Sequence, residues 1–272
     1  MERTPRPCSA FHEVTTIETP SRHIRFAGGT GAELAGRLDL PVDGSPSAIF
    51  LFAHAFGSSK DLRSMNRIAE SLAHKGCAVF RFDFTGVGQS EGDFAKTSFT
   101  TNIADLLAAA DTLRRELAPP EFLFGHSLGG LAALRAAREI PECRGAATYA
   151  APSSTQHLRE ILLRRAPQVL EEVEAVIETI GKQVRVSAAM LEDFAQHDAL
   201  QDVRELGRAG KRILIAQSLA DNLIDPEHGR RLFEAAGIDR MLVESSRADH
   251  LLLANEGDAH ILAAVLAGWA GL

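Results

Sequence analysis

Short, uninterrupted runs of apolar residues, separated by amphipathic segments, constrain the fold of this chain more than any other feature. The runs cover residues 48–53, 78–80, 122–124, 146–149 and 213–216. Runs of this kind are typical of strands buried on both faces of a parallel sheet. Apolar residues at helical spacing occupy segments between most of them, at residues 60–74, 101–117, 128–139 and 226–236. This alternation predicts a mostly parallel, doubly wound α/β sheet in one large domain.

The beginning of the chain departs from this alternation. Residues 1–20 are polar and contain prolines, which predicts an N-terminal extension before a domain that covers residues 21–272. Residues 22–26 and 34–40 read as two strands joined by a glycine-rich turn. They predict an antiparallel hairpin at one edge of the sheet.

A second departure is the long interval of residues 152–210, which has no clear buried strand. Residues 168–180 carry an apolar stripe at helical spacing and predict an amphipathic helix, while residues 182–187 suit a short strand. The interval predicts a small, largely helical, lid-like insertion. A longer crossover packed on the core is the alternative interpretation.

Residues 125–129, Gly-His-Ser-Leu-Gly, form the Gly-x-Ser-x-Gly pattern of a nucleophile elbow. In such an elbow the chain turns sharply from strand to helix, which strains the serine and exposes its hydroxyl. Glycines at both ends keep the turn free of side-chain collisions. A predicted strand precedes the motif and a predicted helix follows it, so we expect Ser127 to be a nucleophile.

A serine hydroxyl needs a base to take its proton, and the base needs an acid that orients it. His250 begins a loop after the last strand-like segment, residues 241–243, whereas His260 falls within a helical pattern. Asp221 follows the strand-like residues 213–216 and is the expected acid. The rival carboxylates suit different roles: Asp225 precedes a proline and is placed to cap a helix N-terminus, and Asp249 adjoins the histidine itself.

An oxyanion formed during acyl transfer needs preorganised N–H donors. We expect one from the backbone of Leu128, directly after the serine, and one from Phe56 in the loop that follows residues 48–53. His54, Ala55 and His126 adjoin these groups and are candidates for the substrate pocket. His54 is expected to brace the loop rather than react, with a plain turn histidine as the alternative, and packing is the role expected of His126.

Other kinds of site find little support in the sequence. The formal net charge of -7 disfavours a nucleic-acid partner, and no stretch is apolar enough to span a bilayer. The histidines show no metal-ligand spacing, and no complete dinucleotide or phosphate loop is present, so we expect neither metal nor cofactor. Asp83 is expected to fix the loop of residues 85–90. Three widely spaced cysteines suit a reducing cytoplasm, and the oligomeric state stays open.

Four segments of the chain resemble the α/β-hydrolase superfamily and occur in its order, namely residues 82–92, 125–129, 219–221 and 248–250. More narrowly, residues 54–61 and 82–86 are similar to the hydrolase half of bifunctional hydrolase/OsmC-family proteins. The sequence ends where an OsmC domain would begin, so we carry over no peroxide-reducing activity. Ala55 stands where many relatives have glycine, which requires that this loop form without a positive φ.

This resemblance and the motifs together predict a serine hydrolase that cleaves a small carboxylic ester or thioester through an acyl-enzyme. An acyltransferase, or a hydrolase of peptide or C–C bonds, would use the same three residues. A ligand-binding protein without catalysis is the alternative from a different class, since a fold does not determine a function.

Overall fold

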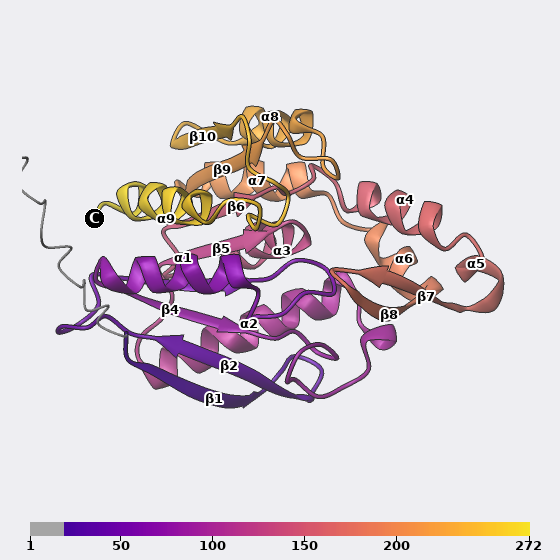
Figure 1. Cartoon of the computed structure of the whole chain (residues 1–272), viewed down its shortest axis with the longest axis horizontal. Helices are drawn as coiled ribbons and strands as arrows, with labels where there is room; N and C mark the ends of the chain where they lie inside the picture. The colour runs from indigo at the N-terminus through magenta and orange to yellow at the C-terminus, as the bar shows by residue number, and fades with distance from the viewer. Residues whose placement is uncertain (1–18) are drawn as a thin grey trace, which may run out of the picture.

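The computed structural model describes residues 19–272, and its centre is a twisted eight-stranded sheet (Figure 1). The predicted N-terminal extension lies almost entirely outside these residues. In spatial order the strands are β1 (Ser21–Ala27), β2 (Glu33–Asp39), β4 (Cys77–Phe82), β3 (Ala48–Ala53), β5 (Phe122–His126), β6 (Gly145–Tyr149), β9 (Arg212–Ser218) and β10 (Arg240–Ser245).

The pairing of the strands is parallel from β4 to β10, and only β2 runs against its neighbours. The predicted mostly parallel sheet and N-terminal hairpin are therefore confirmed. All residues of β3, β4, β5 and β6 are buried, because helices cover both faces of these strands.

Two layers of helices cover the sheet. One face packs against α1 (Arg63–His74) and α9 (Glu256–Ala270), and the other against α2 (Phe99–Glu116), α3 (Leu128–Ala137), α7 (Ala199–Arg208) and α8 (Pro226–Ala235). Strand β3 shows the alternation that follows: Phe50 and Phe52 point to the α1–α9 face, while Ile49 and Leu51 point to the opposite face. The sheet is thus doubly wound.

A smaller unit follows β6 and precedes α7 in the sequence, and it lies to the right of the sheet in Figure 1. It comprises α4 (Thr155–Arg165), α5 (Val169–Glu172), the antiparallel pair β7 (Glu174–Thr179) and β8 (Lys182–Ser187), and α6 (Ala188–Phe194). The turn of this hairpin meets the loop after β3, since a Cβ on Gly57 would lie 2.5 Å from Thr179 Cγ2. The hairpin therefore covers the ends of the parallel strands at which β3 terminates.

The predicted helix over residues 168–180 is wrong. Helix α5 has only four residues, and the chain then forms β7, in which Ala175 and Ile177 are buried while Val176 is exposed. This alternation has the period of a strand. The predicted short strand at residues 182–187 is β8 and pairs with β7.

Candidate active site

Ser127 stands at the sharp turn between β5 and α3, and its backbone is strained. It has φ 54° and ψ −120°, in a region that non-glycine residues rarely occupy. Its N–H donates to the carbonyl of Tyr149 at 2.9 Å. Gly129 allows the close approach that this turn requires, because a Cβ there would lie 2.4 Å from the carbonyl oxygens of Ala53 and His54. The elbow predicted from the motif is present, and Ser127 lines a pocket.

His250 and Asp221 form a close pair beside the same pocket. The Nδ1 of His250 lies 2.7 Å from Oδ2 of Asp221, whose side chain is 1% exposed. The other carboxylate oxygen of Asp221 accepts backbone N–H bonds from Leu223 at 2.8 Å and Ile224 at 3.0 Å. Burial by itself raises the pKa of Asp221, but the hydrogen bond and charge of His250 with these N–H groups bring the pKa below its usual value. Asp221 is therefore an anion that fixes the imidazole orientation.

The loop that carries His250 is held by side chains from three strands. Three consecutive carbonyl groups, from residue 248 to residue 250, each accept one hydrogen bond. Ser218 Oγ donates to the carbonyl of residue 248, Tyr149 OH to that of residue 249 and His126 Nε2–H to that of residue 250. Each of these side chains is buried or nearly so, which ties the position of the imidazole to the sheet itself.

The two N–H groups that are expected to stabilise an oxyanion belong to Phe56, in the loop after β3, and to Leu128. Within residues 19–272, neither N–H group has a hydrogen-bond acceptor. Leu128 is the first residue of α3, so its N–H also lies at the positive end of the helix dipole. The φ of Ala55 is not positive, and the loop forms without the glycine that relatives carry.

His54 braces this loop from inside. Its Nδ1–H donates to the carbonyl of Ala55 at 2.8 Å, and its Nε2 accepts the N–H of Phe84 at 3.1 Å. Burial lowers the pKa of the imidazole, so the ring is neutral. At the far end of the loop, Asp83 accepts the backbone N–H of Lys60. It also accepts the N–H of Gln89, in the loop of residues 85–90 that it was expected to fix.

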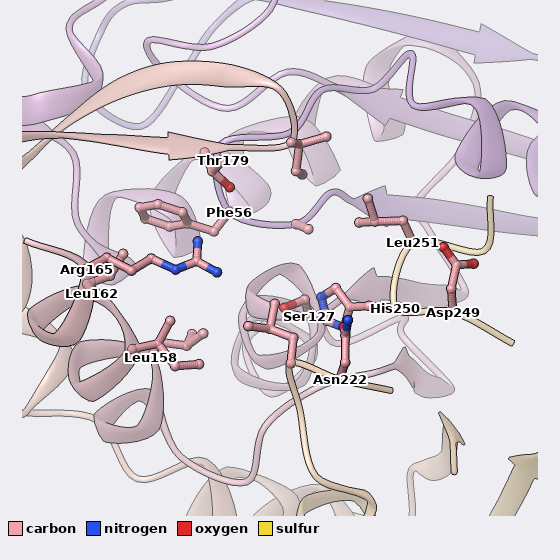
Figure 2. A pocket seen from close by; sticks show the side chains of 14 residues that line it. Phe56, Ser127, Leu158, Leu162, Arg165, Thr179, Asn222, Asp249, His250 and Leu251 are labelled. Carbon is pink, nitrogen blue, oxygen red and sulfur yellow. The ribbon is translucent and has the colours of Figure 1, made fainter. Parts of the chain in front are cut away.

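The pocket in front of Ser127 has a volume of about 430 Å³ (Figure 2). Its lining is mostly apolar and includes Ala55, Phe56, Ser127, Leu158, Ile161, Leu162, Arg165, Thr179, Ile180, Asn222, Leu223, Asp249, His250 and Leu251. Two candidates, His54 and His126, are not among these residues, because each ring is buried behind the loop that it supports. The α4 residues were not predicted to line the pocket, although positions 158, 161, 162 and 165 have the spacing of one helix face.

The rival side chains have other partners. Asp225 caps α8 by accepting the N–H of Glu227 at 2.8 Å, and Asp249 accepts the N–H of Leu253 at 2.7 Å. His260 lies on the exposed surface of α9 and contacts Ser71. Of the carboxylates considered, only Asp221 contacts His250.

Residues 19–272 contain no cluster of three or more histidine, cysteine, aspartate or glutamate side chains that could hold a metal ion. In the same part of the chain, no helix is long and apolar enough to cross a membrane.

Loops after β3, β5, β9 and β10 meet at the carboxyl edge of a doubly wound sheet, in the arrangement of the α/β-hydrolase fold. Residues 44–206 match the Hydrolase_4 family model, described as serine aminopeptidase, S33, and the chain belongs to this family.

Similar proteins agree with this assignment. The esterase domain of a Rhodothermus marinus protein is 34% identical, with a TM-score of 0.74 over 92% of this chain and 98% of that domain. Monoglyceride lipase of Mus musculus is 26% identical over 245 residues, which are 80% of this chain and 77% of the lipase. The mitochondrial palmitoyl-protein thioesterase ABHD10 of Rattus norvegicus is 32% identical over 99 residues, or 36% of this chain, which spans 31% of the thioesterase's length. The protein is accordingly a serine hydrolase.

Proposed function

We propose that the protein hydrolyses an ester or thioester of a small acyl group through an acyl-enzyme on Ser127. The observation that carries the proposal is the 2.7 Å contact between His250 and a buried, anionic Asp221 at the pocket that Ser127 lines. Because Nδ1 of His250 is occupied by this bond, Nε2 is the nitrogen that exchanges protons with the serine and the substrate.

The proposed reaction has two steps. The hydroxyl oxygen of Ser127 attacks the carbonyl carbon while His250 takes its proton, and the N–H groups of Phe56 and Leu128 stabilise the oxyanion. His250 then gives this proton to the leaving alkoxide or thiolate. Water attacks the acyl-enzyme with His250 again as base, which releases the carboxylic acid and restores the serine hydroxyl.

The pocket supports an acyl group of limited size. Phe56 and the α4 residues Leu158 and Leu162 form one apolar wall, and Phe94 packs behind Phe56 with ring centroids 5.2 Å apart. A rigid apolar wall of this kind favours contact with the methylene groups of an acyl chain.

A fluorophosphonate probe and p-nitrophenyl esters of graded chain length test the proposal. We expect the native protein to be labelled and to hydrolyse these esters, and Ser127→Ala to do neither. The p-nitroanilide of the same acyl group, tested in parallel, distinguishes ester from amide hydrolysis. A native, folded protein that neither reacts with the probe nor releases p-nitrophenol would contradict the proposal.

Two aspartates in the same loop region form a matched pair for the proposed acid. We expect Asp221→Asn to lower kcat by about 10³–10⁴-fold, since the imidazole loses its anionic partner. Asp225→Asn removes only a helix-capping carboxylate and should leave kcat within about twofold. Equal kcat values for the two variants would remove Asp221 from the mechanism.

A further inference from the structure

Arg165 is the one arginine or lysine among the described residues that line the pocket. It is the last residue of α4, and it lies on the same helix face as Leu158, Ile161 and Leu162. Figure 2 shows its guanidinium group directed into the pocket beside Phe56, toward the space in front of Ser127. A charged group therefore stands at the end of an otherwise apolar wall.

Within residues 19–272, the exposed guanidinium group of Arg165 has no hydrogen-bond acceptor, whereas Arg114 and Arg185 each pair with two carboxylates. A guanidinium group carries five N–H donors in a planar fork, and this geometry matches a carboxylate. The neighbouring Arg164 is also unpaired within this part of the chain, but it does not line the pocket.

The distribution of charge around the pocket is asymmetric. The other ionised lining residue, Asp249, lies on the far side of His250 from Arg165 in Figure 2 and is engaged by backbone N–H groups of the His250 loop. Asp249 is the one carboxylate among the described residues that line the pocket, so no lining carboxylate lies on the Arg165 side of His250.

We propose that Arg165 selects substrates whose acyl chain ends in an anionic group, with a carboxylate as the simplest case. The methylene chain would lie along Leu158 and Leu162, and the terminal carboxylate would bind the guanidinium group. This inference rests on the proposed ester hydrolysis at Ser127. In the reaction, water cleaves the acyl–oxygen bond of a dicarboxylic half-ester, which yields the alcohol, the dicarboxylate and a proton.

A pair of esters with equal chain length tests the inference. The p-nitrophenyl half-ester of adipic acid carries a terminal carboxylate, and p-nitrophenyl hexanoate ends in a methyl group. We expect Arg165→Gln to lower the ratio of kcat/KM for the adipate ester to that for the hexanoate by about tenfold, chiefly through KM. Arg165→Lys should retain part of the preference, and raised salt should weaken it in the native protein. The matched control Arg164→Gln should leave the ratio unchanged.

The possible outcomes separate this inference from the proposed function. If the hexanoate is not hydrolysed at all, the proposed function fails. If the hexanoate is hydrolysed but Arg165→Gln and Arg164→Gln give the native ratio, only the role of Arg165 is overturned. A comparison of 4-carboxyphenyl hexanoate with phenyl hexanoate tests whether the anionic group lies on the leaving alcohol instead. If Arg165 determined the preference between these two esters, and not that between the adipate ester and p-nitrophenyl hexanoate, the assignment to the acyl chain would be contradicted.

Discussion

At the scale of single residues, the imidazole of His126 supports the loop that carries His250. Its Nε2–H donates to the carbonyl of His250 at 2.8 Å, and its ring centroid is 5.1 Å from that of His250. Burial, and secondly the charge of His250, lower the pKa of His126 to about 3. The ring is therefore neutral in the folded protein, and its protonation would put a positive charge beside the proposed base.

This depressed pKa predicts a loss of stability in acid. Below pH 6.5 the unfolded chain binds a proton at His126 that the folded protein binds only near pH 3, so the free energy of unfolding falls as pH decreases through this window. At pH 5 the loss from this residue is about 2 kcal/mol relative to pH 7. Denaturant titrations at both pH values, on the native protein and on His126→Gln, measure it.

Glutamine is the matched replacement because its amide can donate to the same carbonyl but does not titrate. We expect the difference in unfolding free energy between pH 7 and pH 5 to shrink in His126→Gln. An unchanged difference would mean that other groups account for the acid sensitivity.

Residues with a local sequence signal could be placed from the sequence, and residues defined by distant contacts could not. Ser127 lies within a short motif, and the elbow forms where that motif predicts it. His250 and Asp221 follow strands that could be recognised, and the structure brings them into contact. His54 and His126 were candidates for the pocket, but the structure gives them the supporting roles that the sequence also allowed, since each buried imidazole bonds a carbonyl group.

At the scale of elements, the pattern of apolar residues predicted a helix where the chain forms strand β7 of the β7–β8 hairpin. Positions 169, 173, 176, 177 and 180 fit a helical stripe, but positions 175 and 177 also alternate with exposed neighbours. The two periods overlap in so short a segment, and the enrichment in valine, isoleucine and threonine was the signal that favoured a strand. The turn has positive φ at both Ile180 and Gly181, a feature that the spacing of apolar residues cannot predict.

The same turn yields a prediction about chain-length selectivity. Ile180 has φ 49°, a conformation that asparagine tolerates far better than a β-branched residue, and its side chain lines the pocket. We expect Ile180→Asn to fold at least as stably as the native protein but to lower the ratio of kcat/KM for p-nitrophenyl octanoate to that for the acetate by about fivefold, from lost apolar contact.

Val176 offers a control on the same hairpin, because it is exposed and outside the pocket. Val176→Thr should leave the chain-length ratio unchanged. A ratio that also stays unchanged in Ile180→Asn would show that the turn does not contact the acyl chain.

At the scale of the whole molecule, the order of the strands assembles the site. The four loops begin after residues 53, 126, 218 and 245, and they meet because β3 and β5 are neighbours in the sheet and β9 and β10 follow β6. Strand–helix alternation was enough to predict this sheet, but the pocket also depends on how α4 and the hairpin pack across it. Cys77 and Cys143 are buried and form no disulfide within residues 19–272. The cytoplasmic location and the narrower similarity to hydrolase/OsmC-family proteins stay predictions.

A buried ionic network connects the loop after β3 to the antiparallel edge of the sheet. The ammonium of Lys60, 1% exposed, lies 2.9 Å from Oδ2 of Asp83, which is fully buried. Arg81 donates to the carbonyl of Lys60 at 2.6 Å and to Asp39 of β2 at 2.7 Å. The loop that carries Phe56 is therefore attached to both β2 and β4 through charged groups that water does not reach.

We expect Lys60→Met to lower the free energy of unfolding by about 3–5 kcal/mol, because Asp83 would stay buried without its counterion. In the double variant Lys60→Met/Asp83→Asn no uncompensated charge remains, so part of this loss should be recovered. Denaturant titrations of the native protein, both single variants and the double variant complete the cycle. Strictly additive losses would mean that the two side chains are not coupled. A coupled cycle together with reduced kcat in Lys60→Met would connect this network to the position of the Phe56 N–H group, on which oxyanion stabilisation depends.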